Sequence, residues 1–229
     1  MFSCNASYFC IFLPILFCYA LWQKHSKEKW LKSTIAIILV IFISSFIFHP
    51  KVDFINWLFH LYKDRILPGE IGDLTANAFN FWWLVNPRRV LDTTSFFGIS
   101  ARIWGVVIVS LLFIPMLIWL KKNTSIANLF LSLVFGSIVA FIFLTRIHPR
   151  YLYPFFPLAT ILIGIVSPIQ PIYAVLSVTH LVNIYYLFWA PSFPILEKLY
   201  DYPLFPNTLA VINIIMLALM LRLLASRKI

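Results

Sequence analysis

Long apolar runs, separated by short polar loops, dominate the sequence. Seven of these runs have roughly the 17–25 residues that an α-helix needs to cross about 30 Å of hydrocarbon. They cover residues 2–22, 31–48, 103–120, 126–144, 151–167, 171–189 and 208–224. The pattern predicts an all-α fold, a polytopic transmembrane helical bundle of about seven spans. It divides the chain into two transmembrane helices (1–48), an outer loop (49–100) and five further transmembrane helices (101–229), which include a polar turn at 145–157.

Two stretches of the outer loop have helical spacing of their own. Polar residues in 51–65 recur every three or four positions, which predicts an amphipathic helix in the plane of the membrane interface. These residues are Asp53, Asn56, His60 and Lys63. We predict a second short helix over 74–85, with Asp73 as its N-cap and Asn86-Pro87 at its end. On that helix Asn77 and Asn80 would share a face.

Composition agrees with a membrane protein and excludes a soluble domain. Hydrophobic residues make up 62% of the chain and charged residues only 11%, with a mean hydropathy of +0.90. The net charge of +10 is spread over short loops, so it predicts membrane topology and no nucleic-acid partner. Cys4, Cys10 and Cys18 fall in or beside the first run without metal-ligand spacing, so we expect small core residues and no metal.

Loop charges predict the orientation of the chain. The loops after the first and third runs, with the C-terminal tail, carry nine basic residues and only Glu28 as an acid. The opposite loops carry nine basic residues against seven acids. By the positive-inside rule, the C-terminus is cytoplasmic and the N-terminus lies outside. We therefore expect a multi-pass protein of a bacterial inner membrane or of the endoplasmic reticulum.

The turn at 145–157 contains charged and polar residues that are candidates for a functional site. It reads T-R-I-H-P-R-Y-L-Y-P-F-F-P and lies where one apolar run ends and the next begins. Charge at that depth indicates a functional site by default, since it is costly unless it meets an anion or a cavity. Arginines beside a histidine suit a phosphate at headgroup depth. We therefore predict that Arg146, His148, Arg150 and Tyr151 bind a lipid phosphate. The alternative is that the arginines extend to lipid headgroups and the tyrosine belongs to an aromatic belt.

Amide and aromatic side chains of the outer loop form the second half of this hypothesis. Asn77 and Asn80 suit sugar hydroxyls, and Trp82 and Trp83 suit the flat faces of sugars, so we predict that they bind the sugar or the acceptor. The alternative is an aromatic belt that holds the loop against the membrane. Together the two groups indicate a lipid-linked phospho-sugar whose sugar is transferred on the outer face.

Such a transfer also needs a carboxylate base and cations that stabilise the departing phosphate. The sequence singles out no base; the candidates are Asp53, Glu70, Asp73 and Asp92.

Two segments resemble motifs of a known superfamily. The first motif, residues 74–84, reads L-T-A-N-A-F-N-F-W-W-L, and the second motif, residues 145–154, reads T-R-I-H-P-R-Y-L-Y-P. They resemble motifs of the GT-C integral-membrane glycosyltransferases, in particular the mannosyltransferase-like enzymes that use polyprenyl- or dolichyl-phosphate sugars. In that family the second motif usually reads H-E-R-Y, whereas Pro149 stands at the glutamate position here.

The resemblance implies the C-terminal half of a hexosyl- or mannosyltransferase that uses no cofactor. The family's catalytic aspartate lies in an early outer loop that has no counterpart in this chain, so the resemblance leaves the catalytic residue unassigned. It further implies a fragment, or a partner subunit that supplies the N-terminal half. The other expected partners are a polyprenyl-phosphate-linked sugar and membrane lipid.

Other functions remain open at this point. A flippase or polymerase for lipid-linked saccharides would carry similar basic outer loops, and a non-catalytic membrane subunit or fragment would also fit. A retinal-binding receptor is excluded, because the run at 208–224 contains no lysine for a Schiff base.

Overall fold

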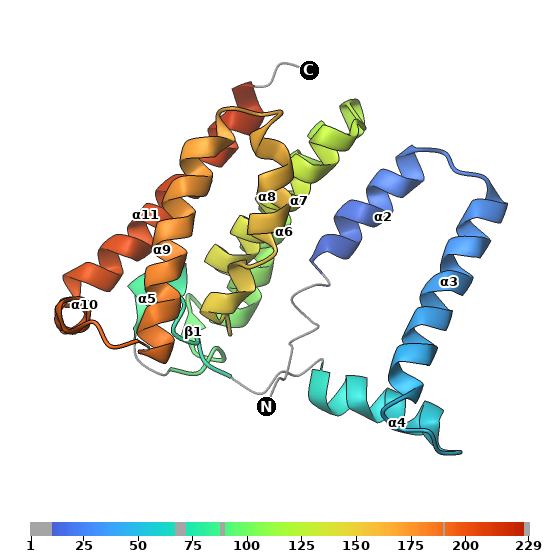
Figure 1. Cartoon of the computed structure of the whole chain (residues 1–229), viewed down its shortest axis with the longest axis horizontal. Coiled ribbons are helices and arrows are strands. Elements are labelled where there is room, and N and C mark those ends of the chain that lie inside the picture. The colour runs from blue at the N-terminus through green and yellow to red at the C-terminus, as the bar shows by residue number, and fades with distance from the viewer. Residues whose placement is uncertain (1–10, 67–71, 88–89, 190, 227–229) are drawn as a thin grey trace. The chain divides into compact units, whose positions relative to one another are not determined.

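The computed structural model describes residues 11–66, 72–87, 90–189 and 191–226. The chain divides into two units, Met1–Glu70 and Ile71–Ile229. This boundary falls inside the outer segment that the sequence pattern defined as 49–100. Figure 1 labels helices and strands of both units.

The first unit consists of helices that follow one another along the chain. They are α2 (Phe12–Trp22), α3 (Lys27–Phe46), α4 (Phe54–His60) and the π-helix η1 (Leu61–Ile66). Ser26 caps α3, because its hydroxyl accepts a hydrogen bond from the Lys29 N–H at 3.4 Å. Phe54 anchors α4: it is buried, and its ring lies 5.0 Å from that of Phe42 on α3.

The amphipathic helix predicted over 51–65 is present as α4 followed by η1. Two histidines lie one turn before an aspartate here: His49 Nε2 is 2.9 Å from Asp53 Oδ1, and His60 Nδ1 is 2.8 Å from Asp64 Oδ2. The placement of this helix in a membrane interface stays a prediction.

The second unit begins with a short helix and a hairpin and continues as a helical bundle. Its elements are α5 (Phe81–Val85), β1 (Ser95–Phe96), β2 (Ile99–Ser100), α6 (Ala101–Lys122), α7 (Ile126–Phe143), the 3-10 turn η2 (Pro149–Leu152), α8 (Phe155–Ile163), α9 (Ile169–Phe188), α10 (Pro194–Tyr200) and α11 (Leu204–Ser226). The two strands pair antiparallel, with Ser95 opposite Ser100. Gly98 turns the hairpin with φ at +80°, a conformation that costs glycine little.

Helix α7 is the buried centre of this bundle and packs against α6, α8 and α11. Its sequence contains no charged residue. Its buried serines are satisfied within the helix, since Ser132 donates to the Asn128 carbonyl and Ser137 to the Leu133 carbonyl. A helix that is apolar on all sides is suited to this central position.

Five helices in the described part of the chain are long and apolar enough to cross a membrane, which is compatible with a multi-pass membrane protein. They are α3, α6, α7, α9 and α11. The count of seven is not confirmed. The run at 151–167 forms only η2 and the nine-residue α8. Pro157 lies in the first turn of α8, the part of a helix that accepts proline most readily. The run at 2–22 is seen only as α2, and residues 2–10 lie outside the described part.

Several polar and aromatic elements gather at one end of the second unit, which we call the α5 end. Helices α6 and α11 begin there and α7 and α9 end there, with α5 and α10 beside them (Figure 1). A cluster of buried side chains joins these elements; its members are Phe79, Trp83, Tyr185, Tyr200, Leu209 and Ala210. The α5 end is therefore where the first motif meets the long apolar helices.

Candidate functional site

The backbones of the first and second motifs lie side by side at the α5 end. Thr75 and Ile147 form a parallel β-bridge, and the Ala76 N–H donates to the Ile147 carbonyl at 2.9 Å. The Arg146 N–H in turn points at the carbonyls of Asp73 and Leu74, at 3.1 and 3.2 Å. Segments that are far apart in the sequence thus form one junction.

The prediction of a helix over 74–85 is wrong for residues 74–80, because α5 begins only at Phe81. Its cap is Asn80, whose Oδ1 accepts from the Trp83 N–H at 3.1 Å; the predicted cap, Asp73, does not cap it. Backbone groups before α5 are bonded by a side chain and not by a helical turn: the Thr75 hydroxyl bonds to both the N–H and the carbonyl of Ala78. Asn77 adopts a left-handed conformation with φ at +64°. Asn77 and Asn80 therefore share no helix face.

Asn80, Trp82 and Trp83 are built into the protein. Their exposed fractions are 0%, 3% and 6%. Asn80 Nδ2 donates to the Phe141 carbonyl and Trp82 Nε1 to the Phe143 carbonyl, at 3.2 and 2.7 Å. Trp83 Nε1 donates to Asn207 Oδ1 at 3.1 Å. Since these polar atoms are used inside the protein, the three side chains fix the first motif to α7 and α11.

Two asparagines of the bundle, which the sequence did not single out, hold Phe79 by its backbone. The Phe79 N–H donates to Asn183 Oδ1 at 3.0 Å, and its carbonyl accepts from Asn213 Nδ2 at 2.8 Å. Asn183 Nδ2 also donates to the Asn77 carbonyl at 2.8 Å. Both amides are buried within α9 and α11. The sequence does contain a signal for these two residues, because each is an amide inside an apolar run.

Arg146, predicted to bind phosphate, forms an ion pair with a carboxylate of the chain. Its Nε and Nη2 donate to the two oxygens of Asp92, at 2.7 and 3.1 Å. The Thr145 hydroxyl also donates to Asp92 Oδ2, at 3.2 Å. The Asp92 side chain is 1% exposed, so the carboxylate of this bidentate pair is enclosed by the protein. Asp92 is accordingly part of the scaffold, because its oxygens are occupied and enclosed.

The other three residues of the predicted phosphate site lie on or next to η2. The Arg150 guanidinium lies 5.7 Å from the centre of the Tyr151 ring, and the rings of His148 and Tyr151 are 6.2 Å apart. His148 Nδ1 is buried and has no hydrogen-bond partner among the described residues. Burial, and then the charge of Arg150, lower the pKa of His148 below its usual 6.5. These surroundings therefore favour the neutral form of the imidazole.

The four candidate bases differ in their surroundings. Asp73 lies in the junction, is partly exposed, and its carboxylate forms no hydrogen bond or ion pair with a described residue. Asp53 belongs to the first unit, Asp92 is paired with Arg146, and Glu70 lies outside the described residues. Among the residues that the structure describes, no three of His, Cys, Asp and Glu gather as a metal site.

The junction thus brings together a partly exposed carboxylate, a cationic turn and an imidazole. Comparison of the chain with models of protein families, with curated proteins and with solved structures finds no match.

Proposed function

We propose that the chain is a GT-C-type membrane glycosyltransferase, or the C-terminal part of one. It would transfer a sugar from a polyprenyl-phosphate donor to an acceptor on the non-cytoplasmic face. The observation that carries this proposal is the hydrogen bond between Ala76 N–H and the Ile147 carbonyl, with the bridge beside it. This pairing brings Asp73, which directly precedes the first motif, next to the cationic second motif.

The lipid phosphate is assigned to the turn η2. Arg150 supplies the cation, with Tyr151 beside it and His148 next to Tyr151. A guanidinium suits phosphate because its donors match two phosphate oxygens at once. Arg146 acts here as a positioning residue, since its ion pair with Asp92 fixes the start of the second motif.

The base is assigned to Asp73, which directly precedes the first motif. It accepts the proton of the acceptor hydroxyl while the acceptor oxygen bonds to the anomeric carbon of the sugar. The bond from that carbon to the phosphate oxygen breaks, and the lipid phosphate leaves with the electron pair, stabilised by Arg150. The side-chain amide of Asn77, which forms no hydrogen bond with a described residue, is assigned to a sugar hydroxyl.

The test uses the full chain in liposomes with radiolabelled polyprenyl-phosphate hexoses, and a membrane extract of the source cells as acceptor. We expect Asp73→Asn and Arg150→Ala each to lower sugar transfer by about 100-fold, as removal of one group that stabilises developing charge does. The matched controls, Asp201→Asn and Arg222→Ala, remove the same charges from exposed positions outside the junction and should leave transfer unchanged.

Two outcomes would contradict the proposal. Transbilayer movement of the labelled lipid without a new glycosidic bond would indicate a flippase. Full transfer by the Asp73→Asn and Arg150→Ala variants would remove the junction from the reaction. The same assay with a co-expressed N-terminal half distinguishes an inactive part of an enzyme from a non-catalytic subunit.

A further inference from the structure

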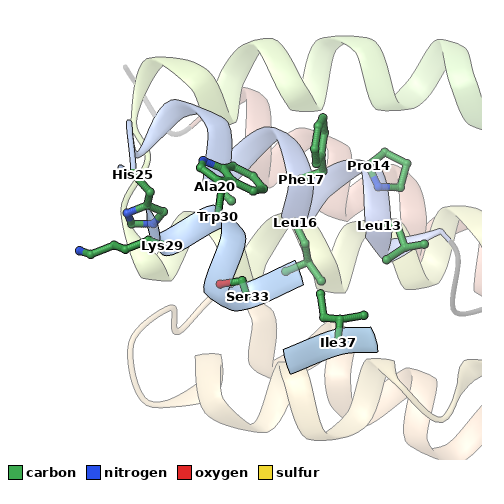
Figure 2. Close-up of a pocket in the computed structure, with 10 residues that line it drawn as sticks. All are labelled: Leu13, Pro14, Leu16, Phe17, Ala20, His25, Lys29, Trp30, Ser33 and Ile37. Carbon is green, nitrogen blue, oxygen red and sulfur yellow. The ribbon is translucent and has the colours of Figure 1, made fainter. Parts of the chain in front are cut away.

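A groove lies between α2 and α3 in the first unit (Figure 2). Its volume is 690 Å³, within the range of roughly 300–1,000 Å³ that is typical of small-molecule sites. The walls are mainly apolar, with Leu16 and Phe17 on α2 and Trp30 and Ile37 on α3. The rings of Phe17 and Trp30 meet edge to face at 5.8 Å and join the two helices.

The two ends of the groove differ in charge. His25 and Lys29 lie at one end and Ile37 at the other (Figure 2). Along α3, Lys29 and Ile37 are separated by about 12 Å at the usual helical rise. Lys29 forms no ion pair with a residue that the structure describes, whereas Lys32 is paired with Glu28 at 2.6 Å. The groove is therefore apolar along most of its length, and the ammonium group of Lys29 at its mouth has no carboxylate beside it among the described residues.

We propose that this groove binds one anionic phospholipid. Its phosphate lies beside Lys29 and His25, and an acyl chain follows the apolar walls. The charge at the mouth favours this occupant over a second apolar helix, which offers that ammonium group no partner, and over a zwitterionic lipid, whose own cation opposes it. In its most apolar window, α3 has no buried residue, so the first unit by itself does not cover this helix. The orientation predicted from loop charges would place the mouth at the cytoplasmic leaflet, where anionic lipids are concentrated.

The first test counts bound lipids by native mass spectrometry. The purified full chain is titrated in detergent with phosphatidylglycerol, or with phosphatidylcholine that has the same acyl chains. We expect one phosphatidylglycerol to bind more tightly than phosphatidylcholine. Lys29→Gln should weaken that binding about fivefold, the effect of one basic group beside anionic lipid. Lys27→Gln is the matched control, because it removes the same charge from the same helical turn but does not line the groove.

A second pair of variants tests the apolar part of the groove. Ser33→Phe fills the channel and should abolish lipid binding, whereas Thr34→Phe, one position away from the lining, should preserve it. Circular dichroism shows whether each variant keeps its helices. Three results would overturn the proposal: equal binding of the two lipids, equal effects of Lys27→Gln and Lys29→Gln, or a dimer of the chain that Ser33→Phe dissociates.

Discussion

At the scale of single residues, the partner of a charged group decides what that group does. The sequence shows Arg146 as a cation at the end of an apolar run, which favours a phosphate ligand. In the structure Asp92 accepts two hydrogen bonds from that guanidinium. By contrast, Asp73 and Arg150 belong to the junction without pairing with one another. The backbone pairing of the two motifs brings the segments that carry these two residues together. The proposed chemistry is based on this pairing.

The Arg146–Asp92 pair leads to a stability prediction. Arg146→Ala should lower the free energy of unfolding by about 3 kcal/mol, because it leaves the buried Asp92 carboxylate without its cation. Asp92→Ala should cost less, since the Arg146 side chain is 24% exposed and can reach water. The double variant should therefore be less destabilised than the sum of the two single variants.

The measurement is the midpoint of unfolding in detergent for all four proteins of this cycle. Arg102→Ala is the control for loss of a positive charge, because its side chain is exposed at the start of α6. Equal losses for Arg146→Ala and Arg102→Ala would show that the ion pair does not stabilise the fold.

At the scale of elements, close backbone approach decides how α6 and α7 meet. Gly105 on α6 lies against the end of α7, and a Cβ atom there would come within 2.6 Å of the Phe143 carbonyl oxygen. The same carbonyl accepts the indole hydrogen bond of Trp82. A residue without a side chain at this position thus allows α6, α7 and α5 to meet at one carbonyl.

Gly105→Ala should therefore destabilise the protein, by about 1–2 kcal/mol as overpacking does. In a helix without this contact, alanine in place of glycine should instead stabilise by about 0.5–1 kcal/mol. Gly164→Ala, which would meet no heavy atom within 4 Å, is the control and should not lower the unfolding midpoint. A gain in stability from Gly105→Ala would contradict the observed packing.

At the scale of the whole second unit, buried amides connect two of the long apolar helices to the first motif. Asn183 on α9 and Asn213 on α11 take both backbone groups of Phe79. The Thr179 hydroxyl completes the network by donating to Asn213 Oδ1 at 2.7 Å. Polar groups inside an apolar bundle are costly unless they are paired, and here they pair with a loop that would otherwise leave its own backbone unsatisfied.

We predict that Asn183→Leu weakens the hold of the bundle on the first motif. The change leaves the buried Phe79 N–H and the Asn77 carbonyl without their partner, which should cost about 2 kcal/mol. Limited proteolysis should then cut residues 72–80 faster, and the unfolding midpoint should fall. Gln170→Leu, an exposed amide on the same helix, should change neither quantity. Unchanged proteolysis of Asn183→Leu would mean that other contacts hold the motif.

Length and hydropathy alone located the five helices α3, α6, α7, α9 and α11, because a run of apolar residues is a local property of the chain. Local chemistry was misleading where tertiary contacts compete with it. Asp73 looked like a helix cap, yet the backbone N–H groups of Leu74, Ala76 and Phe79 donate to distant segments and α5 starts only at Phe81.

The candidate residues of the site were visible in the sequence, but their partners were not. Only the tertiary structure shows that Ala76 hydrogen-bonds to Ile147 and that Arg146 forms an ion pair with Asp92. It also shows that Asn183 hydrogen-bonds to the first motif. These partners are separated by many residues, and nothing in the local pattern of either segment specifies the other. The packing of the helices selects them, because it decides which polar groups must be satisfied by one another once water is excluded.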